Sequence, residues 1–415
     1  MRILWLKTEL LHPVDKGGKI RTYQMLKELK RDHYITYLAL DDGTADSDAY
    51  DKAKEYCHEL ISIPHIFREK YSLKFYFDLA LNVLSPLPYF MTKYRSAGMK
   101  EQISKQLSAG NYDVLVCDFL MPGINVPKST PCATVLFQHN VEAMIWKRHY
   151  QVASNPLKKM YLYGQWLKTR SYEKTCCRSF DEVVAVSRED ANTMQRDYGL
   201  RHVSDVPTGV DTQFFTPSTS ETERHNLVFT GSMDWLPNSD AINYFAEAIL
   251  PKIRECIPDV SLTVVGRNPT QALRDLSKRE PSVQITGRVE DVRPYIARAE
   301  AYIVPLRIGG GTRLKIFEAM AMERPLISTT IGAEGLPLEH EDHILLADTP
   351  ETFAAAVVRV LKDRALAHSL AERGAKKVRE CFGWDKAAKK FAEICEHGAR
   401  THNPQGGKPK VTANK

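Results

Sequence analysis

Short apolar runs alternate with segments of helical apolar spacing along the whole chain of 415 residues. This alternation is typical of α/β folds with parallel sheets, because each strand is followed by a helix before the next strand begins. The apolar runs predict strands at residues 2–6, 35–40, 60–63, 114–117, 134–137, 183–186, 203–206, 227–230, 262–265, 283–285, 301–304, 326–328 and 344–346.

Two domains are expected from the length and from one break in the pattern. A chain of 415 residues is too long for a single ordinary hydrophobic core. Residues 213–225 are polar and contain Pro217, which is typical of a linker. We therefore expect Rossmann-like domains at 1–212 and 226–383, then a helix at 384–396 and a disordered tail at 397–415.

The composition is that of a soluble globular protein, with 43% hydrophobic and 26% charged residues. No run reaches the ~18 apolar residues of a membrane span, and Lys7 and Glu9 interrupt the apolar N-terminus, which predicts a strand and no signal peptide. The eight cysteines form no C-x-x-C pair, which argues against a zinc site and fits a cytoplasmic protein. The net charge of +6 suits phosphates or an anionic membrane and selects neither.

The pattern of residues 301–322 predicts an anion-binding site. An apolar strand, the three glycines 309–311 and a helix follow one another, and the first N–H groups of a helix attract anions. Arg313 and Lys315 add two cations to the first turn, which opposes the helix dipole and favours an anionic ligand. Glu318 lies one turn further on, where it can accept hydrogen bonds from a sugar. A diphosphate joined to a ribose fits this order of groups, and an ordinary βαβ turn is the alternative.

The same segment resembles the donor-binding region of retaining glycosyltransferases of family 4, which have the GT-B fold. The similarity covers roughly residues 1–384 and includes the turn Pro207–Asp211 and the glycines Gly17 and Gly18 near the N-terminus. In the donor region the matching residues are Gly310, Gly311, Thr312, Arg313, Leu314, Lys315, Glu318, Ala319, Met320 and Pro325.

The resemblance implies that two Rossmann-like domains face an interdomain cleft, with the acceptor on the 1–212 side and the nucleotide sugar on the 226–383 side. It implies that helix 384–396 crosses back to the first domain. The implied reaction moves a sugar from a nucleotide diphosphate sugar to a saccharide or lipid-linked hydroxyl acceptor, with retention. No cofactor, no metal and no nucleic acid is implied, and bacterial polysaccharide or glycolipid biosynthesis is the expected pathway.

The resemblance also assigns roles to single residues. His139, at the end of a predicted strand, is expected to contact the transferred sugar or the acceptor, and Glu142 to orient it or cap the next helix. Many family members carry two glutamates eight positions apart. Glu318 matches the second of them, and the position of the first is Gly310 in this chain. The expected catalytic residues are His139, Arg313, Lys315 and Glu318, and the expected donor-binding residues are Gly17, Gly18, Gly231, Ser232, Arg267, Arg288, Gly310, Gly311, Thr312 and Glu334.

Several residues near these sites have a structural alternative. Ser187 predicts a helix N-cap with Asp190 three residues on, while Arg188 faces the cleft or solvent. The loop at 231–235 lacks the cations that the family usually has there, so Arg313 and Lys315 are expected to supply the positive charge for the diphosphate, with help from the Gly231 and Ser232 amides. Trp235 stacks on a ring or closes the core, and Asn238 or Ser239 caps the next helix.

Two segments, 71–95 and 157–174, combine aromatic with basic residues. Such stretches lie on anionic lipid or are ordinary helices with snorkelling side chains. A nucleotide-sugar 2-epimerase or phosphorylase of the same fold, and a non-catalytic nucleotide-sugar-binding protein, are the alternative functions.

Overall fold

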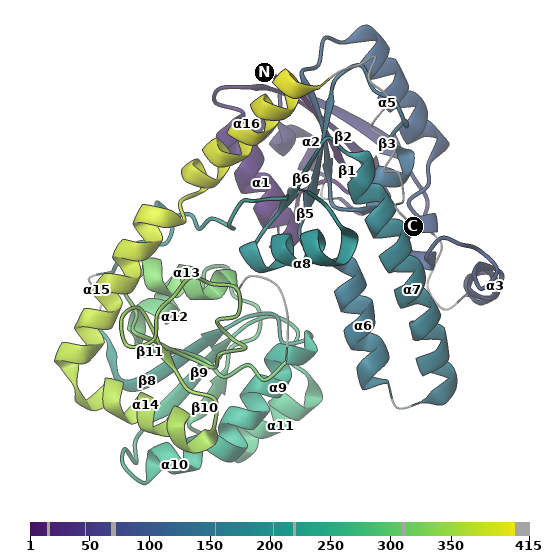
Figure 1. The fold of residues 1–415 in the computed structure, drawn as a ribbon. Helices are drawn as coiled ribbons and strands as arrows, with labels where there is room; N and C mark the ends of the chain where they lie inside the picture. The colour runs from purple at the N-terminus through teal and green to yellow at the C-terminus, as the bar shows by residue number, and fades with distance from the viewer. Residues whose placement is uncertain are drawn as a thin grey trace. The chain divides into compact units, whose positions relative to one another are not determined.

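Each half of the chain folds around its own parallel sheet. A computed structural model describes residues 1–14, 17–45, 47–67, 72–153, 155–201, 203–218, 221–308 and 313–402. The chain divides into unit 1, residues 1–207 with 387–415, and unit 2, residues 208–386 (Figure 1).

The described residues of unit 1 form a sheet of seven parallel strands in the order β3-β2-β1-β4-β5-β6-β7. Its central strands are almost wholly buried because helices cover both faces, as their continuous apolar sequence requires. The strands are β1 (Arg2–Lys7), β2 (Tyr34–Asp41), β3 (Glu59–Pro64), β4 (Val114–Asp118), β5 (Ala133–Gln138), β6 (Glu182–Ala185) and β7 (Ser204–Asp205).

The connections of unit 1 are helical. Two of them, α6 and α7, form an antiparallel pair that extends from the sheet (Figure 1). The helices are α1 (Gly17–Leu29), α2 (Ala49–Lys52), α3 (Leu73–Asn82), α4 (Tyr89–Thr92), α5 (Ala97–Ala109), α6 (Glu142–Val152), α7 (Pro156–Ser179) and α8 (Arg188–Tyr198), with short 3-10 turns at Ala53–Glu55 and Met121–Asn125. Ser187 caps α8 as predicted, since its Oγ accepts a hydrogen bond from the Asp190 N–H, and Arg188 pairs with Asp205 at 2.9 Å.

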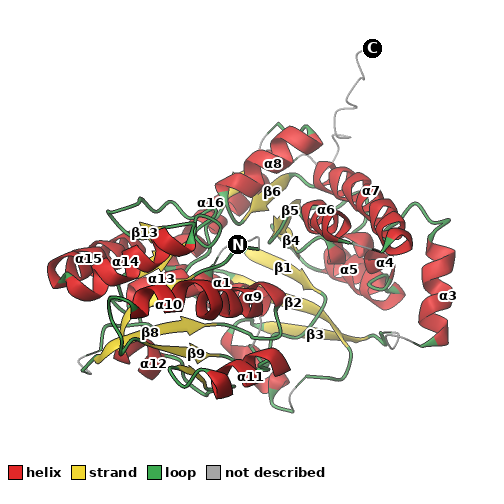
Figure 2. Ribbon diagram, turned by 90° about the horizontal axis from the view of Figure 1, so that it is seen from below, coloured by secondary structure: helices red, strands yellow, loops and turns green. Residues whose placement is uncertain are grey.

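The described residues of unit 2 form a six-stranded parallel sheet in the order β10-β9-β8-β11-β12-β13. The strands are β8 (Glu223–Thr230), β9 (Ser261–Val265), β10 (Val283–Ile285), β11 (Ala299–Val304), β12 (Leu326–Ser328) and β13 (Leu345–Leu346). The helices are α9 (Leu236–Tyr244), α10 (Leu250–Arg254), α11 (Gln271–Arg279), α12 (Arg293–Arg298), α13 (Leu314–Ala321), α14 (Pro350–Lys362) and α15 (Arg364–Cys381), with a π-helical turn at Phe245–Ile249. Figure 2 shows the strands of each sheet side by side with helices packed around them.

The boundary between the units differs from the expected one. Unit 2 begins at Thr208, so residues 208–212 belong to it and not to the first domain. Val210 N donates to the Phe382 carbonyl at 2.7 Å, which fixes this segment to unit 2. The expected linker at 213–225 is also partly wrong, because β8 already starts at Glu223 and the Arg293 guanidinium lies 3.7 Å from the Phe214 ring centroid.

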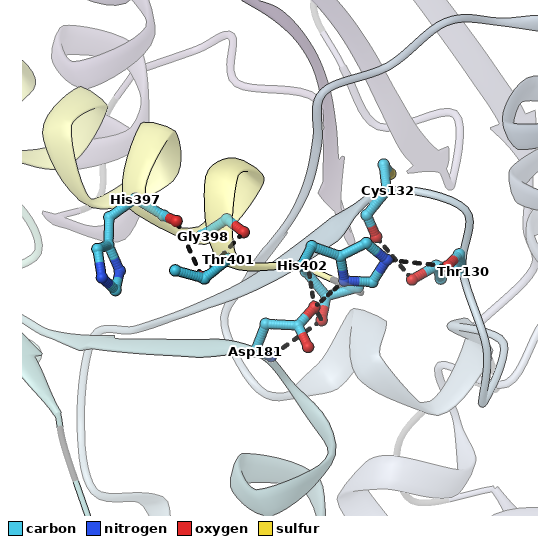
Figure 3. Close-up of polar contacts among 8 residues, drawn as sticks. Thr130, Cys132, Asp181, His397, Gly398, Thr401 and His402 are labelled. Carbon is cyan, nitrogen blue, oxygen red and sulfur yellow. Dashed lines mark hydrogen bonds and ion pairs between the residues drawn. The ribbon is translucent and has the colours of Figure 1, made fainter. Parts of the chain in front are cut away.

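The last helix, α16 (Trp384–Thr401), returns to unit 1, where Phe391 packs 5.5 Å from the Trp5 ring centroid. The predicted helix end at 396 and the predicted disorder from 397 are wrong up to residue 402. His397 contacts Glu182 at 2.9 Å. His402 bridges Asp181 and the Thr130 carbonyl at 3.2 and 3.3 Å, as Figure 3 shows. These contacts stabilise the extra turn, and residues 403–415 lie outside the described part of the chain.

Candidate active site

The helix that carries the predicted anion site is α13, which follows β11 in unit 2. Arg313 occupies its N-cap position, and Ile316, Phe317 and Met320 are buried, with Phe317 stacked at 4.3 Å on Phe382. This packing fixes the first turn of α13 against the unit 2 core. The glycine loop with Gly310, Gly311 and Thr312, which was predicted to bind the phosphates, lies outside the described residues.

Lys315 points from α13 to the end of β8. Its Nζ donates to Asn238 Oδ1 at 2.9 Å and lies 3.9 Å from the Phe229 ring centroid. A Cβ added to Gly231 would lie 2.7 Å from the same Nζ, so the lysine comes close to the backbone of this loop. The loop at 231–235 therefore has a cation that its own sequence does not contain.

Asn238 does not cap α9, contrary to the prediction. The N-cap position of α9 is Trp235, without a side-chain hydrogen bond, and Ser239 Oγ donates to the Leu236 carbonyl. Asn238 instead bridges Lys315 and the loop, because its Nδ2 donates to the Ser232 carbonyl at 2.8 Å. Trp235 is 42% exposed and so does not close the core, and the Arg313 guanidinium lies 5.7 Å from its ring centroid.

The ends of β8 and β9 come together at this loop. Arg267 Nε donates to Ser232 Oγ at 2.9 Å, and that hydroxyl donates to Asp234 at 2.6 Å. A Cβ on Gly266 would lie 1.6 Å from the Gly231 carbonyl oxygen, so only a glycine allows the two strand ends to approach. The structure thus brings Gly231, Ser232, Arg267 and Lys315 together, as parallel strands that end at one sheet edge predict.

The remaining predicted donor residues are more peripheral. Arg288 follows β10, the edge strand, and its side chain is exposed. Glu334 is half-buried in the turn after β12. Neither position has a contact that argues for a role in binding a nucleobase or a sugar.

The electrostatics of α13 are unusual for a helix start. Burial, together with the nearby Arg313, lowers the pKa of Lys315 to about 7. Burial raises the pKa of Glu318 to about 7, although Lys315 opposes the rise. Both shifts mean that the charged forms lack solvation, and an anion bound beside Arg313 and Lys315 would favour the lysine cation.

A second polar cluster lies in unit 1, where β1 and β4 end. Asp118 contacts Lys7 Nζ at 2.9 Å, and it accepts hydrogen bonds from Thr22 Oγ1 at 2.6 Å and from Trp5 Nε1 at 3.0 Å. Lys7 and Asp118 are 1% and 0% exposed. Although burial alone raises it, Lys7 and His139 hold the pKa of Asp118 well below its usual range.

His139 belongs to this cluster. Its Nε2 lies 2.8 Å from Asp118 Oδ1, and its ring stacks on Phe119 at 3.8 Å. Burial lowers the pKa of His139 to about 3 despite the carboxylate, so the imidazole is neutral at pH 7. Sequence reasoning missed Lys7 and Asp118, although the position of Asp118 just after a predicted strand was a usable signal.

Gly17 and Gly18, which were expected to bind the donor, form the first turn of α1. Gly18 faces Phe119, because an added Cβ would lie 3.0 Å from its Cζ. Arg21, one turn further, is buried, and burial lowers its pKa to about 10 although Asp118 opposes this. The absence of a side chain at Gly18 leaves room for the Phe119 ring. Arg21 adds a second positive charge to Lys7, so the cluster around Asp118 has a net positive charge.

The turn between β5 and α6 that carries His139 is held by Glu173 of α7. Its carboxylate accepts hydrogen bonds from the Glu142 and Ala143 N–H groups at 2.9 Å and from Gln138 Nε2 at 3.0 Å. Glu173 therefore caps the N-terminus of α6, and Glu142 does not. This buried network fixes the His139 turn against α7.

A cavity of about 1070 Å³ opens at the same edge of the unit 1 sheet, beside the buried cluster. Lys7 and Phe119 form part of its wall, and α3 and α4 contribute mixed apolar and polar side chains. The other lining residues are Thr8, Glu9, Asp42, His65, Ile66, Phe67, Phe75, Asp78, Leu81, Asn82, Ser85, Tyr89, Phe90, Thr92, Lys93, Tyr94 and Met121.

Two features are absent from the described residues. No group of three or more His, Cys, Asp or Glu side chains is arranged to hold a metal ion. No helix in this part of the chain combines the length and apolar character that crossing a bilayer requires.

Two family models match the chain. The model described as Glycosyltransferase Family 4 matches residues 16–214, and the one described as Glycosyl transferases group 1 matches residues 224–363. An uncharacterized 44.6 kDa protein in the cps region of Klebsiella pneumoniae is 21% identical over 87% of this chain and 91% of its own. A phosphatidyl-myo-inositol mannosyltransferase of Mycobacterium leprae is 27% identical over a segment that covers 35% of this chain and 40% of the length of the relative.

Solved structures share the fold at low identity. Sucrose-phosphate synthase from Thermosynechococcus elongatus has a TM-score of 0.71 and 17% identity, with 95% of this chain and 98% of that chain covered. HepE of Anabaena, solved with UDP and glucose, has a TM-score of 0.65 and 13% identity, with 96% and 100% covered. The family matches and the shared fold agree, and the chain therefore belongs to glycosyltransferase family 4 and has the GT-B fold.

Proposed function

We propose that the protein transfers a sugar from a nucleotide diphosphate sugar to a hydroxyl group of an acceptor, with retention at the anomeric carbon. The observation that carries the proposal is the position of Lys315. Its ammonium group lies at the start of α13, next to Arg313, and contacts Asn238 and the Phe229 ring, which are both neutral. A diphosphate supplies the negative charge that this arrangement favours.

The cations act on the leaving group. As the glycosidic bond breaks, negative charge grows on the diphosphate, and preorganised cations and N–H groups stabilise that charge. Lys315, Arg313 and the α13 N-terminus carry this role without a divalent ion, and Arg267 with Ser232 extends the polar wall. Glu318 accepts hydrogen bonds from the ribose hydroxyls.

The acceptor occupies the cavity of unit 1, beside Lys7 and Phe119. His139, neutral and held by Asp118 and Phe119, contributes a fixed imidazole and no positive charge. It is a positioning residue for this wall of the cavity, and the leaving phosphate takes the acceptor's proton. The names of the Klebsiella and mycobacterial relatives favour bacterial surface polysaccharide or glycolipid synthesis as the pathway.

A thermal-shift screen with UDP, GDP, ADP, CDP and TDP tests the donor site. A ligand that binds only the folded state raises the melting temperature, so one preferred base is expected to do so. The shift is expected to fall sharply in Arg313→Ala and Glu318→Ala. Arg364→Ala, at the exposed start of α15 in the same unit, is the matched control and is expected to behave like the wild type.

Turnover separates transfer from the alternatives. With the preferred nucleotide sugar, release of the nucleoside diphosphate only in the presence of a hydroxyl acceptor indicates transfer. Release without an acceptor, through a 2-epimerised sugar, would contradict it. Equal thermal shifts in the wild type and Arg313→Ala would remove the assigned phosphate site.

A further inference from the structure

One face of α7 exposes large apolar side chains at helical spacing. Leu157, Met160 and Leu167 are 73%, 69% and 42% exposed. Steps of three and seven residues place them on one side of the helix. Gly164 lies on the same side, and nothing is within 4 Å of a Cβ added there. This apolar stripe covers the first half of α7, next to the connection with α6.

The helix α3 exposes a second apolar face. Phe77 and Leu81 of α3, and Leu84 in the turn that follows its end, are 64%, 53% and 87% exposed, and their spacing of four and three residues is that of one helix side. Val83 is 60% exposed beside them. Single exposed apolar residues are ordinary, but two helices that each present an unpartnered apolar face indicate an interaction site.

The two faces belong to one surface. Lys168 of α7 donates to the carbonyls of Asn82 and Val83 at 2.6 and 3.0 Å, which also places a cation at the C-terminal end of α3. Gln165 Nε2 donates to Asn82 Oδ1 at 2.9 Å. Figures 1 and 2 both show α3 at the periphery of unit 1.

The positive charge of α7 favours an anionic partner. Its six basic residues contrast with a single acidic one, Glu173, which is fully buried. Arg170 and Lys174 follow the apolar stripe towards the sheet, so the apolar end of the helix is succeeded by a basic band. The basic residues are Lys158, Lys159, Lys168, Arg170, Lys174 and Arg178.

From these observations we propose that α3 and α7 form a docking surface for an anionic lipid bilayer. The docking surface consists of the six apolar residues Leu157, Met160, Leu167, Phe77, Leu81 and Leu84 with the basic residues of α7. Apolar side chains enter the headgroup boundary while lysines and arginines meet lipid phosphates, which is how amphipathic basic helices lie on membranes. The α6–α7 pair extends from the sheet (Figure 1), and a protruding apolar end suits a deformable bilayer better than a flat protein surface.

The docking surface adjoins the unit 1 cavity, and this step rests on the proposed function. Leu81 is exposed and also lines the cavity, while Phe75, Asp78 and Asn82 of α3 line its wall. A bilayer in contact with α3 therefore lies at the cavity rim. The acceptor that fits this geometry is a lipid-anchored molecule whose hydroxyl-bearing headgroup enters the cavity from the membrane.

Vesicle flotation of the full chain tests the docking surface. The probes are vesicles of phosphatidylcholine alone and of phosphatidylcholine with 30% phosphatidylglycerol. We expect binding to the anionic vesicles and weak binding to the neutral ones. Lys158→Glu/Lys159→Glu is expected to lower the anionic partition coefficient by about tenfold or more. Leu157→Ser/Met160→Ser is expected to lower it by an amount on the order of tenfold.

Two control variants distinguish the docking surface from effects of net charge and of substitution in general. Lys376→Glu/Lys377→Glu changes the same number of charges on α15 of unit 2, and Leu157→Met/Met160→Leu keeps the apolar area. Both are expected to bind vesicles like the wild type. Melting temperature and nucleotide-induced stabilisation report folding and the donor site, so they distinguish failure here from failure of the proposed function. Equal partition of the two charge variants, absence of binding to anionic vesicles, or burial of these helices in a stable dimer would overturn the proposal.

Discussion

Two lysines, one buried in unit 1 and one partly buried in unit 2, are held in opposite ways. Lys7 in unit 1 has a carboxylate partner, Asp118, at 2.9 Å, and Thr22 and Trp5 satisfy the same carboxylate. Lys315 in unit 2 donates its hydrogen bond to the neutral Asn238; Arg313 of the same helix start lowers its pKa, and Glu318 of the same helix opposes that shift. The first lysine is neutralised by the fold, whereas the second favours an anion from outside.

This difference distinguishes a structural cluster from a binding site. A buried ion pair needs no external counter-ion, and removal of one partner leaves an uncompensated charge. Burial lowers the pKa of both lysines, so the difference lies in the partner: a cation whose hydrogen-bond partner is neutral gains most from an anionic ligand. Substitutions of Asp118 and of Lys315 test this difference between the two lysines.

The largest expected effect is on the stability of unit 1. Asp118→Asn removes the charge that neutralises Lys7, which is expected to cost about 3–5 kcal/mol of unfolding free energy. Chemical denaturation measures the loss. The double variant Lys7→Met/Asp118→Asn removes both charges and is expected to recover much of it. Equal losses in the single and double variants would contradict a paired cluster.

Lys315→Met is expected to act on binding and not on folding. Loss of one charge-assisted contact to a phosphate is expected to weaken nucleoside diphosphate binding by about 1.5–3 kcal/mol. The unliganded protein is expected to melt no lower than the wild type, because a poorly solvated charge has been removed. Calorimetric titration and a thermal scan give both numbers, and a variant that unfolds early yet binds normally would show that Lys315 is structural.

The pH dependence of binding reports the same lysine. Its pKa is lowered to about 7 in the free protein, and a bound diphosphate raises it, so binding takes up a proton. The affinity is therefore expected to fall as the pH rises from 7 towards 9, by up to about tenfold per pH unit. Titrations in buffers of different ionisation enthalpy measure this uptake. In Lys315→Met the slope above pH 7 is expected to flatten, and an unchanged slope would point to another group.

The smallest effect concerns the end of α16. His402→Ala removes the contacts to Asp181 and the Thr130 carbonyl (Figure 3). Because Asp181 keeps its bonds from Thr134, the expected loss is about 1 kcal/mol of unfolding free energy. Hydrogen exchange at residues 397–401 is expected to rise, with nucleotide binding unchanged. Altered nucleotide affinity would show that α16 has a role beyond stability.

The sequence predicted the strands because each is a short apolar run, and it predicted parallel sheets because helices alternate with the strands. The order of the strands within each sheet leaves no such local signal. It did not predict where helices end. The helix α16 continues past 396 because His397 and His402 contact Glu182 and Asp181, which are more than two hundred residues away in sequence. Such long-range pairs leave no local pattern.

The candidate site was predicted unevenly. Arg313, Lys315 and Glu318 are close in sequence, so helical spacing sufficed to group them. Asn238 was assigned to the wrong role because a cap and a bridge to Lys315 look alike in a loop sequence. Lys7 and Asp118 were missed because they come together only across the sheet, 111 positions apart. The glycine loop that prompted the prediction, Gly310 and Gly311, lies outside the described residues.

A crystal structure of the protein with its preferred nucleoside diphosphate tests the central claim most directly. We expect both phosphorus atoms at the first turn of α13, with phosphate oxygens within hydrogen-bonding distance of Lys315 Nζ. An ordered nucleotide whose phosphates lie elsewhere, for example against Lys7 and Arg21 of unit 1, would contradict the assignment.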